Sequence, residues 1–595
     1  MKKGLAVGGD AFADLVRKNC YYVDKTLFIR TIMESQSKVL LLTRPRRFGK
    51  TLFMDTIKSF LQVNFGDPGN SEAQKALFSG LRITEDMTFC DQFMGQCPVI
   101  SITLKDVEGL TFESAYVHFA LILVDIVSSY DFLLNSPRLS DIEKKTLRNY
   151  LTPGYLTNLQ NFGDCQDFLK NLTAWLAKHF ERQVVLLIDD YDAPLASAVQ
   201  HGYYAEMLEL MRSFLGQALK AKANTASDAS AYLKKAVLTG CLHEFLLNSN
   251  NFDVNTVCMQ RGPLASAIGF TDSEVDTLLQ YYRLESKKDV VKGWYDGYQI
   301  GQTEIYCPWD VIHFCNDILA EDVDLETFIP ENYWANTSGN NVIDEFLNFL
   351  SEEDADWMQT LIDGGEIELN INEKLTYSDF VHHESRDFWT LLLYSGYLTV
   401  VGRVAEKPNW YKVRIPNEEI RDTFEQNVRQ HFSRSNKQSA HYGEDLARTI
   451  LSGDAAGVRK LLLTLLRKYV SVRDSATKSP PENYYQGFLT AILACAGDIV
   501  QNFRSNQEAG SGFADIVFTS SDWDTGVVIE LKRCAKVSDM RATAQSALEQ
   551  IRTKDYVQAL DDYGCHSGHA FGISFCGKGC FVLSEKLMDR NKKEI

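Results

Sequence analysis

The sequence predicts an α/β protein in which a helix-covered parallel sheet is followed by a helical extension and then by a second, smaller α/β module. Three short apolar runs indicate the first sheet: residues 37–43 (SKVLLLT), 184–188 (VVLLI) and 236–240 (AVLTG). Strands that are apolar throughout are typical of parallel sheets buried on both faces, and helical stretches separate these three. Two further β-runs near the C-terminus, residues 513–518 and 526–532, predict the second module.

Length and composition indicate a large protein with several packed cores. The chain has 595 residues, enough for roughly three or four domains. Its hydrophobic fraction of 45% argues against disorder. No apolar run reaches the roughly 18 residues that a transmembrane helix needs. The apolar stretch within residues 1–10 is too short for a signal peptide, so we expect a cytoplasmic protein with no membrane partner. The 13 cysteines include no CxxC pair, which favours reduced and mostly buried thiols.

The overall charge restricts how the chain could meet nucleic acid. The formal net charge is −18. An acidic surface opposes non-specific coating of phosphate backbones, so the sequence argues against a DNA-packaging protein. Any contact with nucleic acid must then use local basic patches.

The order of modules along the chain follows from composition and periodicity. A polar stretch that contains Pro480 and Pro481 is the clearest linker. The extension before it has mainly helical spacing, with strand-like interruptions near residues 394–401 and 410–415. The predicted sheet domain, helical extension, linker and C-terminal module span residues 1–265, 266–470, 471–481 and 482–595.

A glycine-lysine-threonine turn lies between the first predicted strand and a helix predicted over residues 53–63. Residues 43–51 read TRPRRFGKT, and the last three fit a P-loop. Gly49 would let backbone amides approach phosphates, Lys50 would reach the β and γ groups, and the Thr51 hydroxyl would bind Mg²⁺. The helix N-terminus that follows also favours anions. The pattern therefore predicts a nucleotide site that binds ATP.

Three arginines precede this glycine and are candidate nucleotide contacts as well. Arg44 stands where a P-loop usually has its first glycine, so a basic turn that caps a helix is the alternative on the pattern alone. Arg46 and Arg47 lie in the loop itself and could stabilise charge on the γ-phosphate.

A second strand end strengthens the nucleotide interpretation. The run 184–188 ends directly in Asp189 and Asp190. An apolar strand that ends in paired acids is the Walker B arrangement, in which the first acid holds Mg²⁺ and the second orients water. We therefore expect Asp189 at the metal and Asp190 at the water.

The C-terminal β-runs carry a second candidate site. Residues two apart on a strand point to the same face, so Glu530 and Lys532 project together. Asp515 lies on the preceding run, where it could meet Glu530 across a hairpin. Clustered charges are costly unless something compensates them, and carboxylate oxygens suit Mg²⁺. A metal there could polarise a phosphodiester and generate hydroxide. An ordinary surface hairpin with an ion pair is the alternative.

Several sequence strings together resemble a known family. The strings resemble AAA-ATPase-like proteins that carry a C-terminal PD-(D/E)xK nuclease domain, and the resemblance runs from about residue 5 to 580. It implies a P-loop ATPase-like parallel sheet domain with a helical extension, plus a restriction-endonuclease-like α/β domain. The matching strings are residues 22–26 (YVDKT), 43–52 (TRPRRFGKTL), 188–194 (IDDYDAP), 236–240 (AVLTG), 294–298 (WYDGY), 308–309 (PW), 395–400 (SGYLTV) and 415–421 (IPNEEIR).

The resemblance assigns roles to the acidic residues of the C-terminal module. It implies that Asp515 and Glu530 hold the metal while Lys532 steadies the water and the developing charge. An acid at the start of the helix after the linker can complete such a site, which points to Glu482. Glu508 is a second candidate. A structural role for either acid, at a helix N-terminus or a strand end, is the alternative.

A helix predicted after the Lys532 strand carries a further candidate. Gln550, with Tyr556 six residues later, resembles the DNA-contacting end of many such nucleases. A solvated helix face is the alternative.

Two departures from the family bear on the rate of ATP hydrolysis. The family usually has glutamate where this chain has Asp190, and an arginine near the position of His243. A shorter acid would position water poorly, and a missing arginine would leave γ-phosphate charge without compensation. We therefore expect slow turnover, unless a partner chain in a homo-oligomer supplies the arginine.

These observations predict a nucleotide-regulated, metal-dependent nuclease that hydrolyses phosphodiester bonds, with DNA favoured over RNA. Its expected cofactors are ATP and Mg²⁺, with Mn²⁺ as a substitute at the nuclease site, and its expected partners are nucleic acid and nucleotide. A non-enzymatic, nucleotide-binding assembly or scaffold protein with degenerate ATPase and nuclease sites is the alternative.

Overall fold

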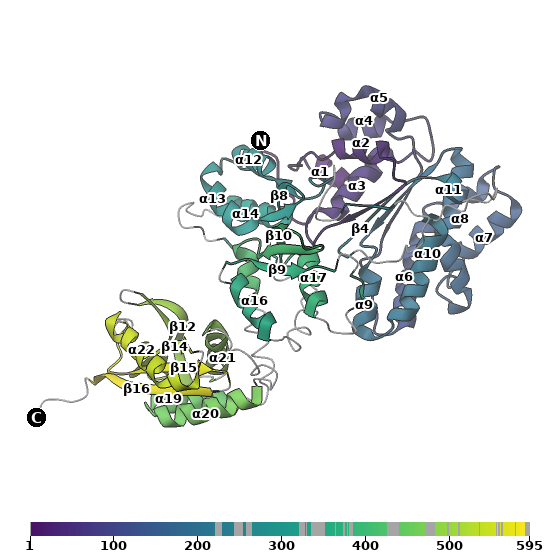
Figure 1. Ribbon diagram of the computed structural model, residues 1–595. Helices are drawn as coiled ribbons and strands as arrows, with labels where there is room; N and C mark the ends of the chain where they lie inside the picture. Colours follow the sequence, from purple (N-terminus) through teal and green to yellow (C-terminus); the bar gives the residue numbers. More distant parts are fainter. Residues whose placement is uncertain are drawn as a thin grey trace, which may run out of the picture. The chain divides into compact units, whose positions relative to one another are not determined.

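The computed structural model places two compact units, each of which is described by itself (Figure 1). The N-terminal unit comprises residues 1–336 and 368–420, and the C-terminal unit comprises residues 337–367 and 421–595. The structure describes residues 2–219, 229–242, 254–257, 264–320, 328, 330–334, 352–362, 364–372, 375–377, 379, 385–424, 440–469, 482–494, 496, 499–509, 512–534, 536–554, 556, 560, 563–577 and 579–589.

The N-terminal unit is built on a five-stranded parallel sheet. Its strand order is β2-β3-β4-β1-β5, so β4 lies between β1 and β3. The register pairs Leu41 of β1 with Leu238 of β4, and Leu238 with Ile188 of β3. The carboxyl ends of all three strands therefore meet at one edge of the sheet. The bounds are β1 Val39–Thr43, β2 Val99–Thr103, β3 Val184–Asp189, β4 Leu233–Gly240 and β5 Val254–Val257.

Helices cover both faces of this sheet, as the apolar strands require. α6, α8 and α10 pack on one face around a large apolar cluster, and α3 packs on the other (Figure 1). The helices before the last sheet strand are α1 Phe12–Arg17, α2 Leu27–Glu34, α3 Lys50–Leu61, α4 Glu72–Phe78, α5 Met87–Phe93, α6 Phe112–Ser128, α7 Asp141–Leu151, α8 Phe162–Phe180, α9 Ala193–His201, α10 Tyr204–Leu219 and α11 Ala229–Tyr232.

The extension that follows contains more strand than a mainly helical pattern predicts. It holds two three-stranded sheets, in the orders β6-β8-β7 and β10-β11-β9, and these belong to the same unit as the large sheet. The predicted interruptions correspond to β10 and β11. The bounds are β6 Phe270–Thr271, α12 Asp272–Tyr282, α13 Lys288–Tyr295, β7 Tyr298–Ile300, β8 Thr303–Tyr306, α14 Pro308–Ala320, β9 Ile367–Asn370, α17 Ser385–Ser395, β10 Thr399–Arg403 and β11 Trp410–Arg414.

The C-terminal unit is a five-stranded sheet between two helical layers. Its order is β12-β13-β14-β15-β16, with β14 and β15 parallel and the other pairs antiparallel. α19, α20 and α21 pack on one face and α22 on the other. The bounds are α16 Glu352–Ile362, α19 Ala440–Leu451, α20 Ala455–Tyr469, α21 Glu482–Ala494, β12 Val500–Ala509, β13 Gly512–Ser520, β14 Thr525–Arg533, α22 Met540–Thr553, β15 Ser567–Cys576 and β16 Gly579–Asp589.

The module boundaries expected from sequence stay a prediction, and the two compact units divide the chain at other positions. Residues 266–336 and 368–420 of the extension belong to the unit of the large sheet, whereas residues 337–367 and 421–470 belong to the C-terminal unit. The expected linker, residues 471–481, lies outside the described residues. Among the helices that the structure describes, none is both long and apolar enough to span a membrane.

Candidate functional site

The loop after β1 has the backbone form of a phosphate cradle. Gly49 is the N-cap of α3 and adopts a left-handed conformation with φ 89°. A Cβ there would meet no atom within 4 Å, so backbone conformation and not space explains the glycine. Arg47 also has a positive φ, 69°. The loop therefore turns sharply and leaves open space in front of the helix N-terminus.

Lys50 lies buried beneath this loop. Its Nζ donates to the carbonyl oxygens of Arg44 and Pro45 at 3.0 and 3.1 Å, and lies 3.6 Å from Oδ1 of Asp190. Burial disfavours the charged ammonium, but the acidic groups around it, Cys241 and Asp190 first among them, raise its pKa on balance. The lysine is thus held as a cation at the strand ends.

Asp189 joins three elements at the same edge of the sheet. Its Oδ2 accepts a 2.6 Å hydrogen bond from the Thr51 hydroxyl, and its Oδ1 accepts one from the Thr239 hydroxyl. Burial, followed by the charge of Asp190, raises the pKa of Asp189, while the two hydroxyls and Lys50 oppose that rise. The adjacent oxygens of Thr51 and Asp189 are the donor set that Mg²⁺ prefers.

Sequence reasoning missed Thr239 and Asp192. Besides its bond to Asp189, the Thr239 hydroxyl accepts the backbone N–H of Asp190 at 3.3 Å. Oδ2 of the buried Asp192 accepts the N–H groups of Cys241 and Leu242 at 3.0 and 2.8 Å. Thr239 lies in the string 236–240 and Asp192 in the string 188–194. The spacing of a threonine or an aspartate in such strings does not by itself indicate these hydrogen bonds.

His243, whose position bears on the expected rate, lies outside the described residues. Asp190 has a left-handed φ of 49° and is only partly buried. Its carboxylate lies beside Lys50, with Oδ1 3.6 Å from Nζ. The predicted water-orienting role of Asp190 stays a prediction.

The three arginines of the loop have different surroundings. Arg44 is 1% exposed, and its guanidinium donates to the carbonyls of Thr43 and Ala265 at 2.7 and 2.9 Å. Such contacts support the loop from inside, and a direct contact of Arg44 with nucleotide stays a prediction. Arg46 and Arg47 are exposed on the open side of the loop.

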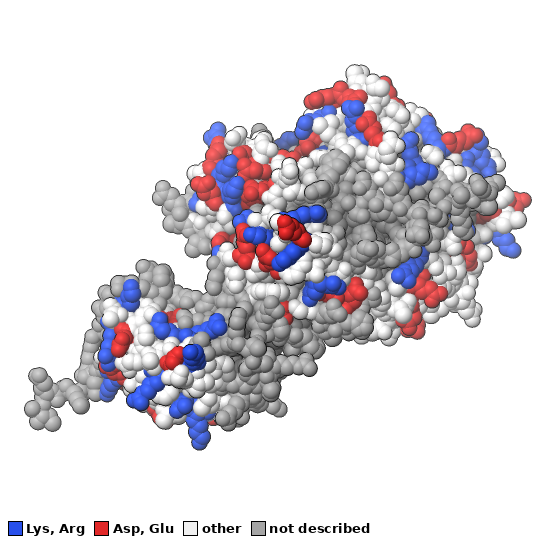
Figure 2. All heavy atoms as spheres, viewed as in Figure 1, with Lys and Arg blue, Asp and Glu red and all other residues white. Residues whose placement is uncertain are grey.

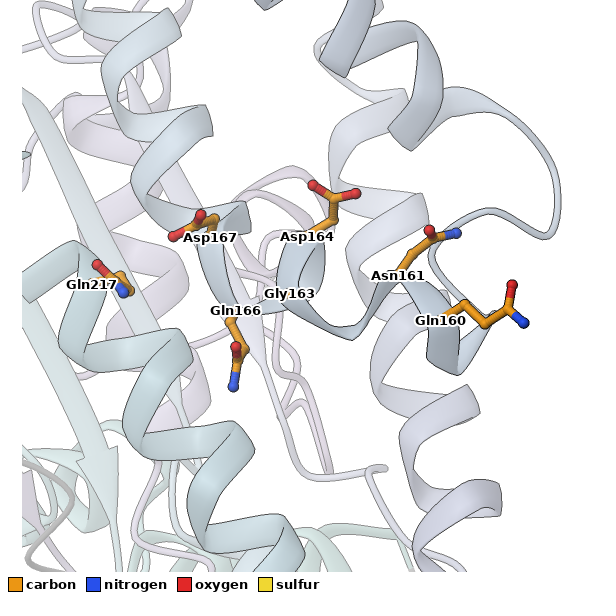
Figure 3. A pocket seen from close by; sticks show the side chains of 7 residues that line it. All are labelled: Gln160, Asn161, Gly163, Asp164, Gln166, Asp167 and Gln217. Atoms are coloured by element: carbon orange, nitrogen blue, oxygen red, sulfur yellow. The ribbon is translucent and has the colours of Figure 1, made fainter.

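A cavity of about 360 Å³ at the start of α8 is a separate feature (Figure 3). It is lined by acids, amides and a glycine, and none of these residues belongs to the loop between β1 and α3. Because no basic side chain lines it, the cavity is unsuited to phosphate. Its lining consists of Gln160, Asn161, Gly163, Asp164, Gln166, Asp167 and Gln217.

In the C-terminal unit, the two predicted metal ligands lie on neighbouring strands. The antiparallel register pairs Ile516 of β13 with Ile529 of β14, so Asp515 and Glu530 are the next pair along the ladder. Oδ2 of Asp515 accepts the N–H of Leu531 at 2.7 Å. Glu530 is 4% exposed, so its carboxylate has little contact with water. Two oxygen ligands on adjacent strands fit a divalent metal.

Gln550 and Tyr556 complete the surroundings of Glu530. The Gln550 amide donates to Oε1 of Glu530. Tyr556 is buried beside this amide, and its pKa is raised by burial and further by Glu530 and Asp515. Lys532, partly buried, follows Glu530 on the same face of β14. The structure therefore gathers five of the candidate residues around one strand end.

A glycine on the neighbouring strand sets the position of α22. Gly572 is opposite Glu530 in the parallel register of β14 and β15. A Cβ at Gly572 would lie 2.3 Å from the carbonyl oxygen of Ala544 in α22. The helix thus approaches the sheet more closely than a side chain would allow, which brings Gln550 over Glu530.

The remaining acidic candidates, Glu482 and Glu508, lie on elements whose positions the structure gives without their side chains. Glu482 begins α21 and Glu508 lies on β12, and both side chains are outside the described part of the structure. Gln486 of α21 was not predicted, yet its amide donates to the backbone oxygen of Asp515 at 3.0 Å and to Ser505 Oγ at 3.2 Å. Across the described residues, no group of three or more His, Cys, Asp and Glu side chains is arranged to hold a metal.

Comparison with family models identifies both modules. Residues 6–247 match the family described as "Predicted AAA-ATPase". Residues 480–585 match the PD-(D/E)XK nuclease superfamily. The chain therefore carries an AAA-ATPase-like domain and a C-terminal PD-(D/E)XK nuclease superfamily domain. The predicted α/β fold class and two-module architecture are therefore confirmed.

Proteins similar to this chain include a curated sequence and a solved structure. An uncharacterized protein from the vnfD 5′ region of Azotobacter chroococcum mcd 1 is 23% identical over 508 residues, covering 83% of this chain and 82% of that protein. The Walker-type ATPase PABY2304 of Pyrococcus abyssi is 12% identical, with a TM-score of 0.33, and the match covers 68% of this chain and 96% of that one.

Proposed function

We propose that this protein is a nucleotide-regulated, metal-dependent nuclease that hydrolyses phosphodiester bonds of nucleic acid, with DNA favoured over RNA. The proposal depends mainly on the position of Asp515 opposite Glu530 on the neighbouring strands β13 and β14. Glu530 is buried there and accepts a hydrogen bond from Gln550. Burying a carboxylate is costly unless it is compensated, and a divalent cation would compensate two at once.

The chain's own residues have distinct tasks in this proposal. Asp515 and Glu530 would hold Mg²⁺ or Mn²⁺, which supplies an activated water and polarises the phosphodiester. Gln550 fixes the orientation of Glu530, and the N–H of Leu531 fixes that of Asp515. Lys532 would stabilise negative charge that develops on the scissile phosphate.

Basic side chains near the site support contact with a polyanion. Arg533, Lys536 and Arg541 are exposed where β14 leads into α22. Basic side chains stand out over acidic ones on the face of the C-terminal unit shown in Figure 2. A local basic surface can bind phosphates even though the whole chain is acidic.

The N-terminal unit would bind ATP as a regulator and hydrolyse it slowly. Lys50 and the loop amides would hold the phosphates, and Thr51 and Asp189 would hold Mg²⁺. Asp190 is one methylene shorter than the glutamate of the family, so we expect weak positioning of the attacking water.

The deciding experiment is incubation of the full chain with labelled single- and double-stranded DNA and RNA, in Mg²⁺ or Mn²⁺, with and without ATP. Metal-dependent cleavage that Asp515→Ala abolishes supports the nuclease. Intact substrates in every condition would refute it and favour the non-enzymatic assembly protein.

A further inference from the structure

The phosphate loop, residues 44–49 between β1 and α3, packs against the extension along almost its whole length. Successive loop residues contact segments from four different parts of residues 264–420. The contacts join Arg44 to the carbonyls of Leu264 and Ala265, Pro45 to Gly396, Arg47 to the Trp309 ring, and Phe48 to the Tyr298 ring. A change in the conformation of the loop would therefore change its contacts with the extension.

Arg47 makes the contact that a phosphate can most easily displace. Its guanidinium carbon lies 3.9 Å from the centre of the Trp309 ring, a cation–π contact. The side chain is exposed and belongs to the loop that would hold phosphate. A bidentate, charge-assisted bond to phosphate competes well with an exposed cation–π contact.

The next residue after Trp309 is a buried acid under the influence of Arg47. Asp310 lies in the first turn of α14 and is 1% exposed. Burial raises the pKa of Asp310 to about 6, and hydrogen bonds with Cys307 and Glu419, followed by the positive charge of Arg47, oppose that rise. Arg47 therefore favours the ionised form of a carboxyl group that has little water around it.

Asp310 forms a buried pair of acids with Glu419. Burial, followed by the charge of Asp310, raises the pKa of Glu419 to about 10, while the N–H groups of Trp334 and Tyr333 oppose that rise. Asp310 makes hydrogen bonds with the Cys307 thiol and with Glu419. A proton on Glu419 lets that side chain donate to Asp310, so the pair is stable as one acid and one carboxylate.

Glu419 holds together the two segments at which the chain leaves the N-terminal unit. Its Oε1 accepts the N–H groups of Tyr333 and Trp334 at 2.6 and 2.9 Å, and its backbone oxygen accepts the Asn332 amide at 3.1 Å. The chain passes into the C-terminal unit after Asn336 and again after Ile420. The carboxyl group of Glu419 thus links the two segments at which the chain leaves the N-terminal unit.

We propose that Arg47 is a phosphate-responsive switch whose movement from Trp309 to bound nucleotide loosens, through Asp310 and Glu419, the anchoring of residues 332–334 and 419–420. The proposal rests on ATP binding at the loop and names a route by which that binding reaches the connections to the nuclease domain. When Arg47 leaves, the buried charge of Asp310 loses its nearby cation. The Asp310–Glu419 pair must then rearrange, and the amides that Glu419 holds are released.

Backbone hydrogen exchange at Tyr333 and Trp334 tests this route in the full chain. Exchange of the segment that contains these amides is measured with Mg²⁺ alone and with Mg²⁺ and ATP, and ATP binding is measured separately by calorimetry. In the parent, ATP should accelerate exchange of this segment. In Arg47→Gln, exchange without ATP should already match that of the ATP-bound parent.

Two substitutions in the buried pair serve as the matched comparison. Asp310→Asn removes the charge on which Arg47 acts, so ATP should bind but no longer change the exchange. Glu419→Gln keeps a donor toward Asp310 and an acceptor for Tyr333 and Trp334, so its exchange without ATP should equal that of the parent.

The outcomes separate this proposal from the proposed function. ATP binding without a change in exchange in the parent, or an unchanged response in Asp310→Asn, would overturn the switch alone. Failure of ATP to bind the parent would overturn the nucleotide part of the proposed function and the switch with it. If Asp310→Asn lowers the melting temperature strongly, the Arg47→Gln result decides, because that side chain is exposed.

Discussion

The Thr51 hydroxyl lies 2.6 Å from Oδ2 of Asp189, although 138 positions separate the two residues in sequence. The contact exists because β1 and β3 flank β4 in a parallel sheet, so the loop after one strand faces the end of the other. Ligand sites at the carboxyl ends of strands are a general feature of such sheets. This relationship makes the sheet edge at which Thr51 and Asp189 meet a candidate nucleotide site.

Lys50→Ala should weaken ATP binding strongly, because it removes the buried cation beneath the loop. A ligand selective for the folded state raises stability by about 2.7 kcal/mol at a hundred times its Kd, so the shift in melting temperature with ATP reports the loss. Lys58→Ala is the matched control, since Lys58 is exposed on the same helix. Equal affinity in the parent and Lys50→Ala would refute this site. Each variant is compared with its own ATP-free melting temperature, since Lys50 also bonds the loop carbonyls.

Asp190→Glu should raise the rate of ATP hydrolysis, because the longer acid reaches further toward the γ-phosphate. Steady-state turnover measured over a range of protein concentrations also reveals an arginine supplied by a second copy, since such turnover rises with concentration. Fast turnover of the parent at low concentration, unchanged in Asp190→Ala, would show that another residue positions the water.

The strand ends and the alternation on β14 could be predicted because they depend on local pattern. Asp189 directly follows an apolar run, Lys50 follows the turn after another, and Glu530 and Lys532 are two residues apart. A parallel sheet or a hairpin then brings such residues together without further information.

The remaining contacts could not be predicted, because they depend on packing between distant segments. Thr239 bonds Asp189, and Gln486 bonds Asp515, through side chains whose types occur everywhere in proteins. Asp310 and Glu419 are ordinary acids in sequence, and only burial in the fold raises the pKa of each. The short strands of the extension, three to five residues in β7 and β10, carry too little periodicity to exclude helix.

Asp515→Ala and Glu530→Ala should each abolish nucleic-acid cleavage and leave the fold intact. Each substitution removes one of two carboxylates proposed to hold the metal, and neither removes apolar packing. Cleavage of labelled DNA in Mg²⁺ measures the effect, with circular dichroism as a check on folding. Glu549→Ala is the control, because Glu549 is exposed on α22 beside Gln550. Parental rates in both variants would mean that these residues are not catalytic.

Gly572→Ala should destabilise the C-terminal unit and reduce cleavage together. The added Cβ would lie 2.3 Å from the Ala544 carbonyl oxygen, so α22 must move away from the sheet. Overpacking of this kind costs about 1–3 kcal/mol, and the shift also carries Gln550 away from Glu530. Gly487→Ala is the control, since a Cβ there meets nothing within 4 Å. Parental stability and activity in Gly572→Ala would show that α22 does not depend on this close approach.

The stability of the N-terminal unit should fall as pH rises above neutrality, through Glu419. Its pKa is raised from 4.5 to about 10 in the folded protein, so the folded state binds this proton more tightly than the unfolded state. The resulting stabilisation is complete below about pH 4.5 and is lost progressively as the pH rises toward 10. Glu419→Gln cannot titrate and keeps the hydrogen bonds, so its unfolding free energy should fall less between pH 6 and pH 9, a window set by that shift. Denaturant unfolding at a series of pH values measures both proteins, and the difference between them cancels the groups that titrate alike in each. Parallel pH profiles for the parent and Glu419→Gln would show that Glu419 is ionised in the folded protein and does not supply the proton to Asp310.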